Sequence, residues 1–208
     1  EEKPGELSGP ACAILMKNLW LARLARPDIQ KPICDLAAKI TKWTRNDDKR
    51  LFRLLCYLNA TKSHKLVGKV GDPSSVLKLR LYVDADFAGE TDTARSTNGG
   101  FLVVVGPNTW FPLTWVTKKQ TSTSRSTTES EVVSLAYSLF HEALPAMALW
   151  DVVLGRPVTL EIMEDNQATM KVVASGYSAK LRHVSRTHKV DLSSIKEVLD
   201  LDCVKLLY

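Results

Sequence analysis

The pattern of apolar and polar positions divides the chain into a helical first third and a mixed remainder. Apolar residues recur at helical spacing in three early segments, residues 11–25, 33–44 and 47–61. A stretch with two glycines, an aspartate and a proline follows at residues 68–75 and is the best candidate for a boundary. The pattern therefore predicts a loose tail over residues 1–10, a helical segment over residues 11–70 and a second domain over residues 71–208.

Strand and helix periods alternate in the second domain. Leu77, Leu79, Leu81 and Val83 alternate with polar residues, which predicts a half-buried strand. Further strands are expected at residues 100–105, 113–117, 158–163 and 203–208, and helices at residues 126–155, 166–175 and 192–199. Pro145 should kink or split the longest of these helices. The order of the elements predicts an α/β fold with a mixed sheet flanked by helices.

Carboxylates follow two of the predicted strands. Asp84 and Asp86 lie on the same side of the first strand, although aspartate at a strand end often only begins a turn. Glu131 and Asp165 gather with Asp84 at one sheet edge if the first and fourth strands are neighbours. Each also has a structural alternative, because Thr128 and Glu131 have capping-box spacing and Asp165 could cap the next helix. Their joint placement favours a site for two Mg²⁺ ions, for which Mn²⁺ could substitute.

Composition narrows the possible functions. The chain has 208 residues and a net charge of +5, with basic, hydroxyl-rich stretches at residues 116–125 and 180–189 that suit phosphate. The four cysteines are scattered without C-x-x-C pairs, which predicts reduced thiols in an intracellular protein. No apolar run reaches the length of a membrane span, so no membrane association is expected. An acidic start without an initiator methionine predicts a fragment of a longer protein.

Four segments carry a resemblance to a known family. They are YVDADFAGE, RSTNGGFLV, TWVTKKQTSTSRSTTESEVVSLA and EDNQATMKVV, in this order. They resemble the segments Y-x-D-A-D-W-A-G, R-R-S-T-S-G, W-x-S-K-K-Q with S-S-T-E-A-E-Y, and C-D-N-Q-S-A of the ribonuclease H domain of copia-type retrotransposon Pol polyproteins. Upstream, ARPDI and RLFRLLCYLNATKSHKL are similar to the end of the reverse transcriptase segment of the same polyproteins.

The resemblance implies a ribonuclease H-like fold and a metal-dependent endonuclease that cleaves the RNA strand of RNA–DNA hybrids. It implies that Asp84, Glu131 and Asp165 are both the catalytic residues and the metal ligands. Glu131 is favoured over Glu129 because it stands directly before the apolar VVSLA. The expected partners are the RNA–DNA hybrid and the remainder of the reverse transcriptase polyprotein, and the expected location is a cytoplasmic particle or the nucleus.

Further residues have weaker roles in this expectation. Ribonucleases H place a fourth acid on a helix after the final strand, and the chain ends before such a helix, which predicts weakened activity. Asp86 and Asp191 are possible auxiliary acids, Asp191 being equally suited to cap a surface helix.

The substrate itself would be recognised through its backbone and 2′-hydroxyl groups. Candidate contacts are Lys118, Lys119 and Arg125 to phosphate, and Asn166 and Gln167 to a 2′-hydroxyl. The alternatives are a solvated strand edge for the lysines and helix-start chemistry for the two amides.

Two other functions remain open. One is a catalytically weak or inactive domesticated remnant that binds nucleic acid or protein. The other is an integrase-like nuclease, which is less favoured because the match extends well beyond the acids.

Overall fold

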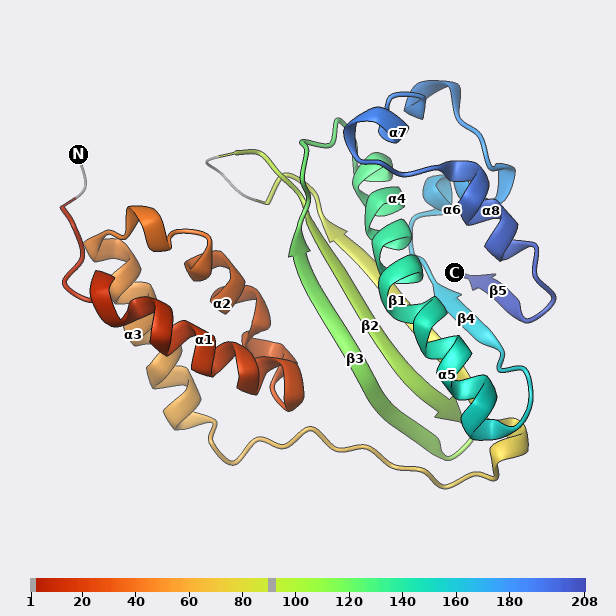
Figure 1. Ribbon diagram of the computed structural model, residues 1–208, viewed down its shortest axis with the longest axis horizontal. Coiled ribbons are helices and arrows are strands. Elements are labelled where there is room, and N and C mark those ends of the chain that lie inside the picture. The colour runs from red at the N-terminus through yellow and green to blue at the C-terminus, as the bar shows by residue number, and fades with distance from the viewer. Residues whose placement is uncertain (1–2, 90–92) are drawn as a thin grey trace. The chain divides into compact units, whose positions relative to one another are not determined.

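The computed structural model describes residues 3–89 and 93–208 and contains two compact units, Glu1–Val67 and Gly68–Tyr208. The division falls at the start of the glycine-containing stretch that follows the early helices. The first unit contains the helices α1 (Ser8–Leu24), α2 (Gln30–Ala37) and α3 (Arg45–Ala60), with single 3-10 turns at Pro27–Ile29 and Ile40–Lys42 (Figure 1). Leu15, Ile33 and Leu51, one from each helix, are fully buried in its core.

The start of the first unit differs from the prediction. The backbone amides of Glu6 and Leu7 donate to the carboxylate of Asp48, at 2.8 and 3.1 Å, and Pro4 forms a β-bridge with Thr44. The loose tail predicted for residues 1–10 is therefore wrong for residues 3–10, while residues 1 and 2 lie outside the described residues. A local pattern does not reveal this segment, because its partners lie some 40 positions away in the sequence.

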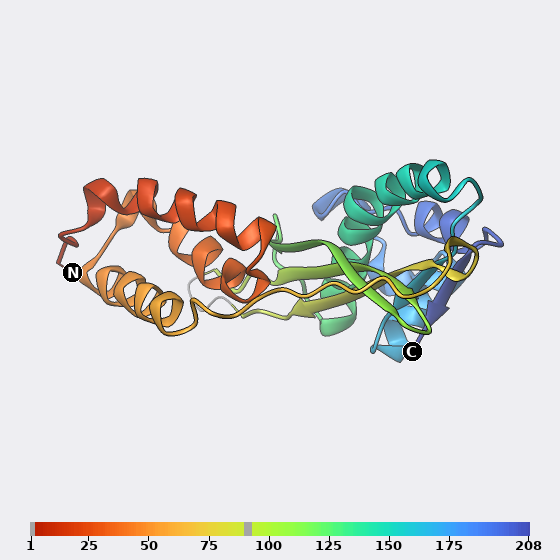
Figure 2. The same cartoon turned by 90° about the horizontal axis from the view of Figure 1, so that it is seen from below.

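The second unit is built on a single five-stranded sheet. The strands are β1 (Lys78–Asp86), β2 (Thr97–Gly106), β3 (Thr109–Lys119), β4 (Leu160–Met163) and β5 (Val204–Leu207). Their order is β3-β2-β1-β4-β5, with β1, β2 and β3 antiparallel and β4 parallel to both β1 and β5. The sheet is twisted, as Figure 2 shows from below. The prediction that the first and fourth strands are neighbours is confirmed.

Helices complete the second unit. The run after β3 consists of α4 (Thr127–Ser138), a π-helical turn η4 (Leu139–Ala143) and α5 (Leu144–Leu154), which follow one another as one continuous helix. The helix is therefore not split at Pro145, which stands at the start of α5, directly after the π-helical turn. The smaller elements are α6 (Gln167–Ser175), α7 (Val184–Thr187) and α8 (Leu192–Leu199), with 3-10 turns at Ser74–Val76 and Ala179–Leu181. Leu135 and Leu139 pack on Leu81 and Ile162 in one core, so α4 lies along the sheet (Figure 1). This is the predicted mixed sheet flanked by helices.

Judged by length and composition alone, the helical run Thr127–Leu154 could cross a membrane. Among the described residues it is the one helix that meets these two criteria. Half of its most apolar 18-residue stretch is buried inside the protein. Leu135 and Leu139 in its first half are buried in the core of the second unit, whereas Leu149, Val152 and Val153 near its end are exposed.

Candidate active site

Asp84 lies near the end of the central strand β1. Its side chain is exposed, whereas Val83 and Ala85 on either side are buried. The hydroxyl of Ser134 on α4 donates to the carbonyl oxygen of Asp84 at 2.6 Å and lies 3.2 Å from that of Gly99. Helix α4 is therefore held against the strand at the residue that carries the first acid.

Asp86, the second acid of β1, lies against the loop that follows. Its carboxylate lies in the space in which a Cβ at residue 89 would lie, so a side chain in place of Gly89 would displace the Asp86 carboxylate. Ala88 has a φ of 51°, and its amide donates to the hydroxyl of Ser96 at 3.2 Å. The Asp86 carboxylate and the Ser96 hydroxyl thus both lie against the turn that follows β1.

Glu131 is buried beneath the end of β1, with a side chain on α4 that is directed at the sheet. The residue is 4% exposed, and its Oε2 has no hydrogen-bond partner. Burial, followed by the charges of Glu164, Asp84 and Asp165, raises the pKa of Glu131 to about 8, against the opposing effect of the Ala85 amide. Glu131 therefore shares one electrostatic site with both of the other predicted acids.

Glu129 has a different role from Glu131. Ser126 is the N-cap of α4 and accepts from the amide of Glu129 at 3.1 Å, while Glu129 Oε2 accepts from the amide of Arg125 at 3.0 Å. The helix thus begins earlier than the Thr128 start considered from the sequence, and the capping-box explanation of Glu131 is wrong.

Asp165 follows β4 and is exposed. The N-cap of α6 is the next residue, Asn166, whose Oδ1 accepts from the amides of Ala168 and Thr169 at 3.0 and 3.1 Å. The alternative explanation of Asp165 as a helix cap is therefore wrong. Gln167 is exposed at the first position of α6.

Glu164 is a fourth acid of this site that sequence reasoning missed. It is 1% exposed, its amide donates to the carbonyl of Leu207 at 3.0 Å, and its Oε1 accepts from the amide of Asn166 at 3.0 Å. Its Oε2 is buried without a partner, and burial, together with the charges of Asp165 and Asp84, raises its pKa to about 7. The sequence feature that could have indicated this burial is the two-residue period of a strand. It places residue 164 on the same side of the strand as the buried residues 160 and 162.

These carboxylates have the chemistry of a site for a hard cation. Buried charged oxygens without partners are costly, and divalent cations such as Mg²⁺ prefer oxygen ligands of this kind. Across residues 3–89 and 93–208, no three Asp, Glu, His or Cys side chains stand close enough to hold an ion as they are placed. The carboxylate oxygens are therefore ligands of the type that the predicted cation prefers. The side chains would have to move closer together to coordinate it.

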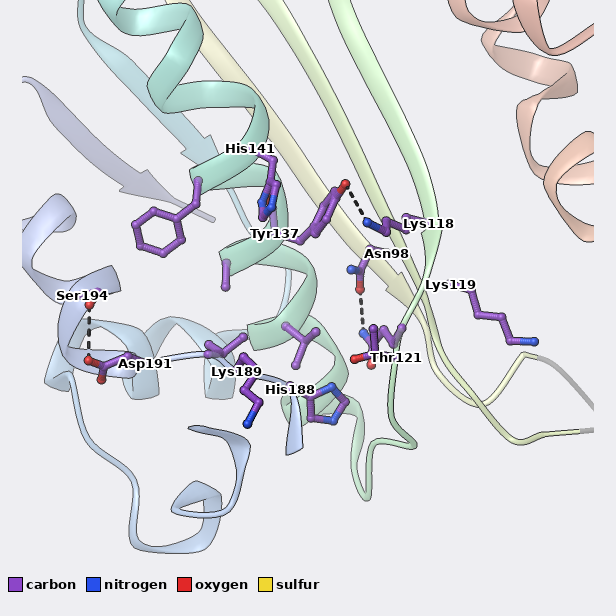
Figure 3. A pocket seen from close by; sticks show the side chains of 15 residues that line it. Asn98, Lys118, Lys119, Thr121, Tyr137, His141, His188, Lys189, Asp191 and Ser194 are labelled. Carbon is purple, nitrogen blue, oxygen red and sulfur yellow. Dashed lines mark hydrogen bonds between the residues drawn. The ribbon is translucent and has the colours of Figure 1, made fainter. Parts of the chain in front are cut away.

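The other predicted residues occupy separate positions. Lys118 and Lys119 end β3 and line a pocket beside α4, which also contains Asp191 (Figure 3). Asp191 is the N-cap of α8 and accepts from the amide of Ser193 at 3.0 Å. Arg125 is exposed in the loop before α4.

Comparison with known proteins identifies the relatives of this chain. The Retrovirus-related Pol polyproteins from transposons RE2 and RE1 of Arabidopsis thaliana are each 35% identical to it over 122 residues, which is 59% of the chain. The chain is a homologue of copia-type retrotransposon Pol polyproteins. It spans 8% of the length of each of these two polyproteins. No family model matches it.

The homology and the strand order agree on the fold class. The order β3-β2-β1-β4-β5, with an antiparallel meander and two parallel strands, forms the ribonuclease H-like mixed sheet that the resemblance to the Pol polyproteins implies. Among solved structures, LC11-RNase H1, isolated from compost, is 14% identical, with a TM-score of 0.38, over 63% of this chain and 83% of its own.

Proposed function

We propose that this chain is the ribonuclease H part of a retrotransposon Pol polyprotein and cleaves the RNA strand of RNA–DNA hybrids with the help of Mg²⁺. The observation that carries the proposal is the pair of buried carboxylate oxygens without partners, on Glu131 and Glu164, in one electrostatic site with Asp84 and Asp165. Homology to the Pol polyproteins supports the same activity class.

The four acids divide into an exposed pair and a buried pair. Asp84 and Asp165 are exposed, so they are open to a substrate, whereas Glu131 and Glu164 are buried. Asp84, Glu131 and Asp165, with Glu164 added from the structure, would hold two Mg²⁺ ions, or Mn²⁺ in their place. Bound there, the ions would polarise the scissile phosphate and supply an activated water.

The remaining residues would position the site and the hybrid. Ser134 ties α4 to β1 at Asp84, and the Asn166 cap starts α6 directly after Asp165. The exposed Arg125 and Gln167 are the candidates for contact with a phosphate and a 2′-hydroxyl near the acids. Because the Asn166 side-chain oxygen already caps α6, only its amide nitrogen remains for the substrate role predicted for it.

The test is cleavage of a labelled RNA–DNA hybrid with Mg²⁺ or Mn²⁺. We expect Asp165→Asn and Glu131→Gln each to lower the rate by more than about 100-fold. The matched control is Asp200→Asn, which removes an exposed carboxylate paired with Lys196 on α8 and should leave the rate unchanged. Equal rates for all variants would overturn the proposal, and salt-sensitive hybrid binding without cleavage would instead favour the non-catalytic remnant.

A second readout tests the metal directly. Saturating Mg²⁺ should raise the Tm of the wild-type chain, because a ligand of the folded state stabilises it by about 2.7 kcal/mol at 100 times its Kd. Glu131→Gln and Glu164→Gln should both reduce this rise. If Glu131→Gln reduces it and Glu164→Gln does not, the metal site stands and Glu164 is not part of it.

A further inference from the structure

A buried carboxylate joins the start of α4 to the segment that follows α6. This segment, the arm (residues 178–190), contains the 3-10 turn Ala179–Leu181 and α7, and α7 lies beside the start of α4 (Figure 1). Nε2 of His183 lies 3.1 Å from Oε1 of Glu129, which is 54 positions away in the sequence. Nε2 of His188 lies 3.3 Å from the same oxygen, beside the first turn of α4 (Figure 3). These three side chains form one cluster, the clasp.

Further contacts hold the arm beside the clasp. The hydroxyl of Ser122, in the loop before α4, donates to the carbonyl of Thr187 at 2.8 Å, and Leu181 and Val184 are buried in the core of the second unit. Lys189, near the end of the arm, has a φ of 60°, in the left-handed region that a side chain disfavours. The contacts of the docked arm therefore also have to offset this backbone strain.

The two histidines of the clasp have different surroundings. The side chain of His183 is 27% exposed, whereas that of His188 is 1% exposed and neither of its ring nitrogens makes a well-aligned hydrogen bond. Burial lowers the pKa of His188 from its ordinary 6.5, and the charge of His183 adds to this, against the opposing effect of Glu129. A proton on His183 is balanced by the Glu129 carboxylate, but a second proton, on His188, would leave a buried positive charge without a counterion.

The other charged groups around the clasp are mainly cations. The arm carries four exposed ones, Lys180, Arg182, Arg186 and Lys189. His188 also lines the pocket beside α4, whose other ionisable residues are Lys118, Lys119, Tyr137, His141, Lys189 and Asp191. The carboxylate among them, Asp191, accepts from the hydroxyls of Ser193 and Ser194. A second proton on the clasp would therefore add positive charge where cations already predominate.

We propose that Glu129, His183 and His188 form an acid-sensitive clasp, which holds the arm on α4 at neutral pH and releases it when His188 gains a proton. Release takes up one proton from solvent and exposes the His188 ring to water, while Glu129 stays ionised in both states. The proposal requires neither a metal ion nor cleavage, so it is independent of the function proposed above.

The direction of the pH dependence follows from the two states of the arm. His188 has a lowered pKa when the arm is docked and its ordinary pKa of 6.5 when the arm is released. The docked state is therefore complete above pH 6.5 and is lost as the pH falls below it. Because one proton is taken up, the equilibrium constant for release should rise by up to about tenfold for each pH unit below that value.

Amide hydrogen exchange from about pH 5 to about pH 7.5, in EDTA, measures this release directly. The reporters are the amides of Arg186, Thr187 and His188, which donate to carbonyl oxygens within the arm at 2.9 to 3.0 Å. The reference is the amide of Met170 in α6, which donates to the carbonyl of Asn166 at 3.0 Å. After correction for intrinsic exchange, we expect the arm to lose protection below pH 6.5 relative to α6.

A single substitution isolates the group that takes up the proton. His188→Gln keeps an N–H donor toward Glu129 but cannot become charged, so the protection of its arm should not change with pH. The matched control is His64→Gln, which removes an exposed histidine of the first unit and should keep the wild-type dependence on pH. Circular dichroism verifies the fold of both variants.

NMR titration of the His188 ring protons in the wild-type chain requires no variant. We expect an apparent pKa below 6.5, with the arm amides shifting over the same range. An apparent pKa of 6.5 or above would overturn the proposal. So would an equal pH dependence in the wild type and His188→Gln, or a parallel loss of protection in the arm and in α6, since the latter indicates unfolding of the whole unit.

Discussion

Two pairs of buried glutamates in the second unit show opposite ways of placing a carboxylate inside a protein. Glu161 on β4 is bound by Lys78 at 2.9 Å and by Arg80 at 2.6 Å, and Glu129 on α4 by a backbone amide and two imidazoles. Glu131 and Glu164 each keep one oxygen buried without any partner. The pKa of Glu161 is lowered by Lys78 and Arg80 despite its burial, whereas those of Glu131 and Glu164 are raised.

The difference separates structural carboxylates from candidate functional ones. A buried carboxylate that is paired with cationic side chains of the protein is already stabilised, so it needs no bound ligand. An unpaired one destabilises the metal-free fold and is retained where a ligand satisfies it. Sequence position does not reveal the distinction, because Glu129 and Glu131 stand in the same turn of one helix.

The largest expected effect comes from breaking a satisfied pair. Glu161→Gln should lower the free energy of unfolding by about 2 kcal/mol, because Lys78 and Arg80 lose their charged partner. Glu131→Gln, measured in EDTA at about pH 9 where the Glu131 carboxyl is ionised, should cause no loss and should stabilise the fold, since it removes a buried charge that has no counterion. Urea denaturation of both variants checks this, and equal losses would contradict the contrast.

The pH dependence of stability sharpens the same contrast. Burial raises the pKa of Glu131 from its ordinary 4.5 to about 8, and that of Glu164 to about 7. A raised pKa in the folded state gives stability that is complete below pH 4.5 and is lost as the pH rises through 7 to 8. In EDTA the wild-type chain should therefore lose at least about 1 kcal/mol over this range, or about 2–4 °C in Tm.

Thermal melts of the wild type and Glu131→Gln in metal-free buffer across this pH range provide the measurement. The variant should show a shallower decline. Parallel curves of Tm against pH for the two proteins would mean that the Glu131 carboxyl does not cause the loss of stability. Glu161 contributes the opposite pH dependence of stability. Because its pKa is lowered in the folded state, its contribution to stability is lost as the pH falls.

A smaller effect distinguishes the two neighbours at the start of α6. Asn166→Ala should cost about 1 kcal/mol of stability, because its side chain caps the helix through two amides. Asp165→Asn should leave stability unchanged in EDTA and remove cleavage. A substantial loss of stability in Asp165→Asn would show that this acid has a structural role after all.

The smallest expected effect concerns the start of α4. Thr128→Ala should change stability by less than about 0.5 kcal/mol, since Thr128 is not the cap of the helix. Ser126→Ala should cost about 1 kcal/mol, because the Ser126 hydroxyl accepts from the Glu129 amide. A comparison of the two by chemical denaturation decides which residue begins the helix, and the reverse order would restore the capping-box explanation of Glu131.

Features with a strong local period could be predicted from the sequence. The alternation before Asp84 locates β1, and the Asn166 start and Gly176 end of α6 follow from ordinary capping chemistry. The gathering of Asp84, Glu131 and Asp165 depended on one topological assumption, that the first and fourth strands are neighbours, and the sheet satisfies it.

Features that depend on distant partners could not be predicted. Residues 3–7 look like a polar tail, yet Asp48 and Thr44 hold them in place. Glu164 looks like a turn residue next to Asp165, and only its burial in the folded unit shows that it belongs with the acids. The pocket beside α4 likewise joins β3 to the segment before α8, which no local pattern relates.

The place of β1 in the sheet also determines when the acids can meet during folding. The pairing of β1 with β2, and of β2 with β3, joins strands that follow one another in the sequence, whereas the pairing of β1 with β4 joins Arg80 to Glu161, which are 81 residues apart. Loop-closure entropy delays such distant contacts, so the antiparallel meander can form before β4 docks. The charge repulsion among the four carboxylates therefore arises only at the last stage, when most of the core is already available to oppose it.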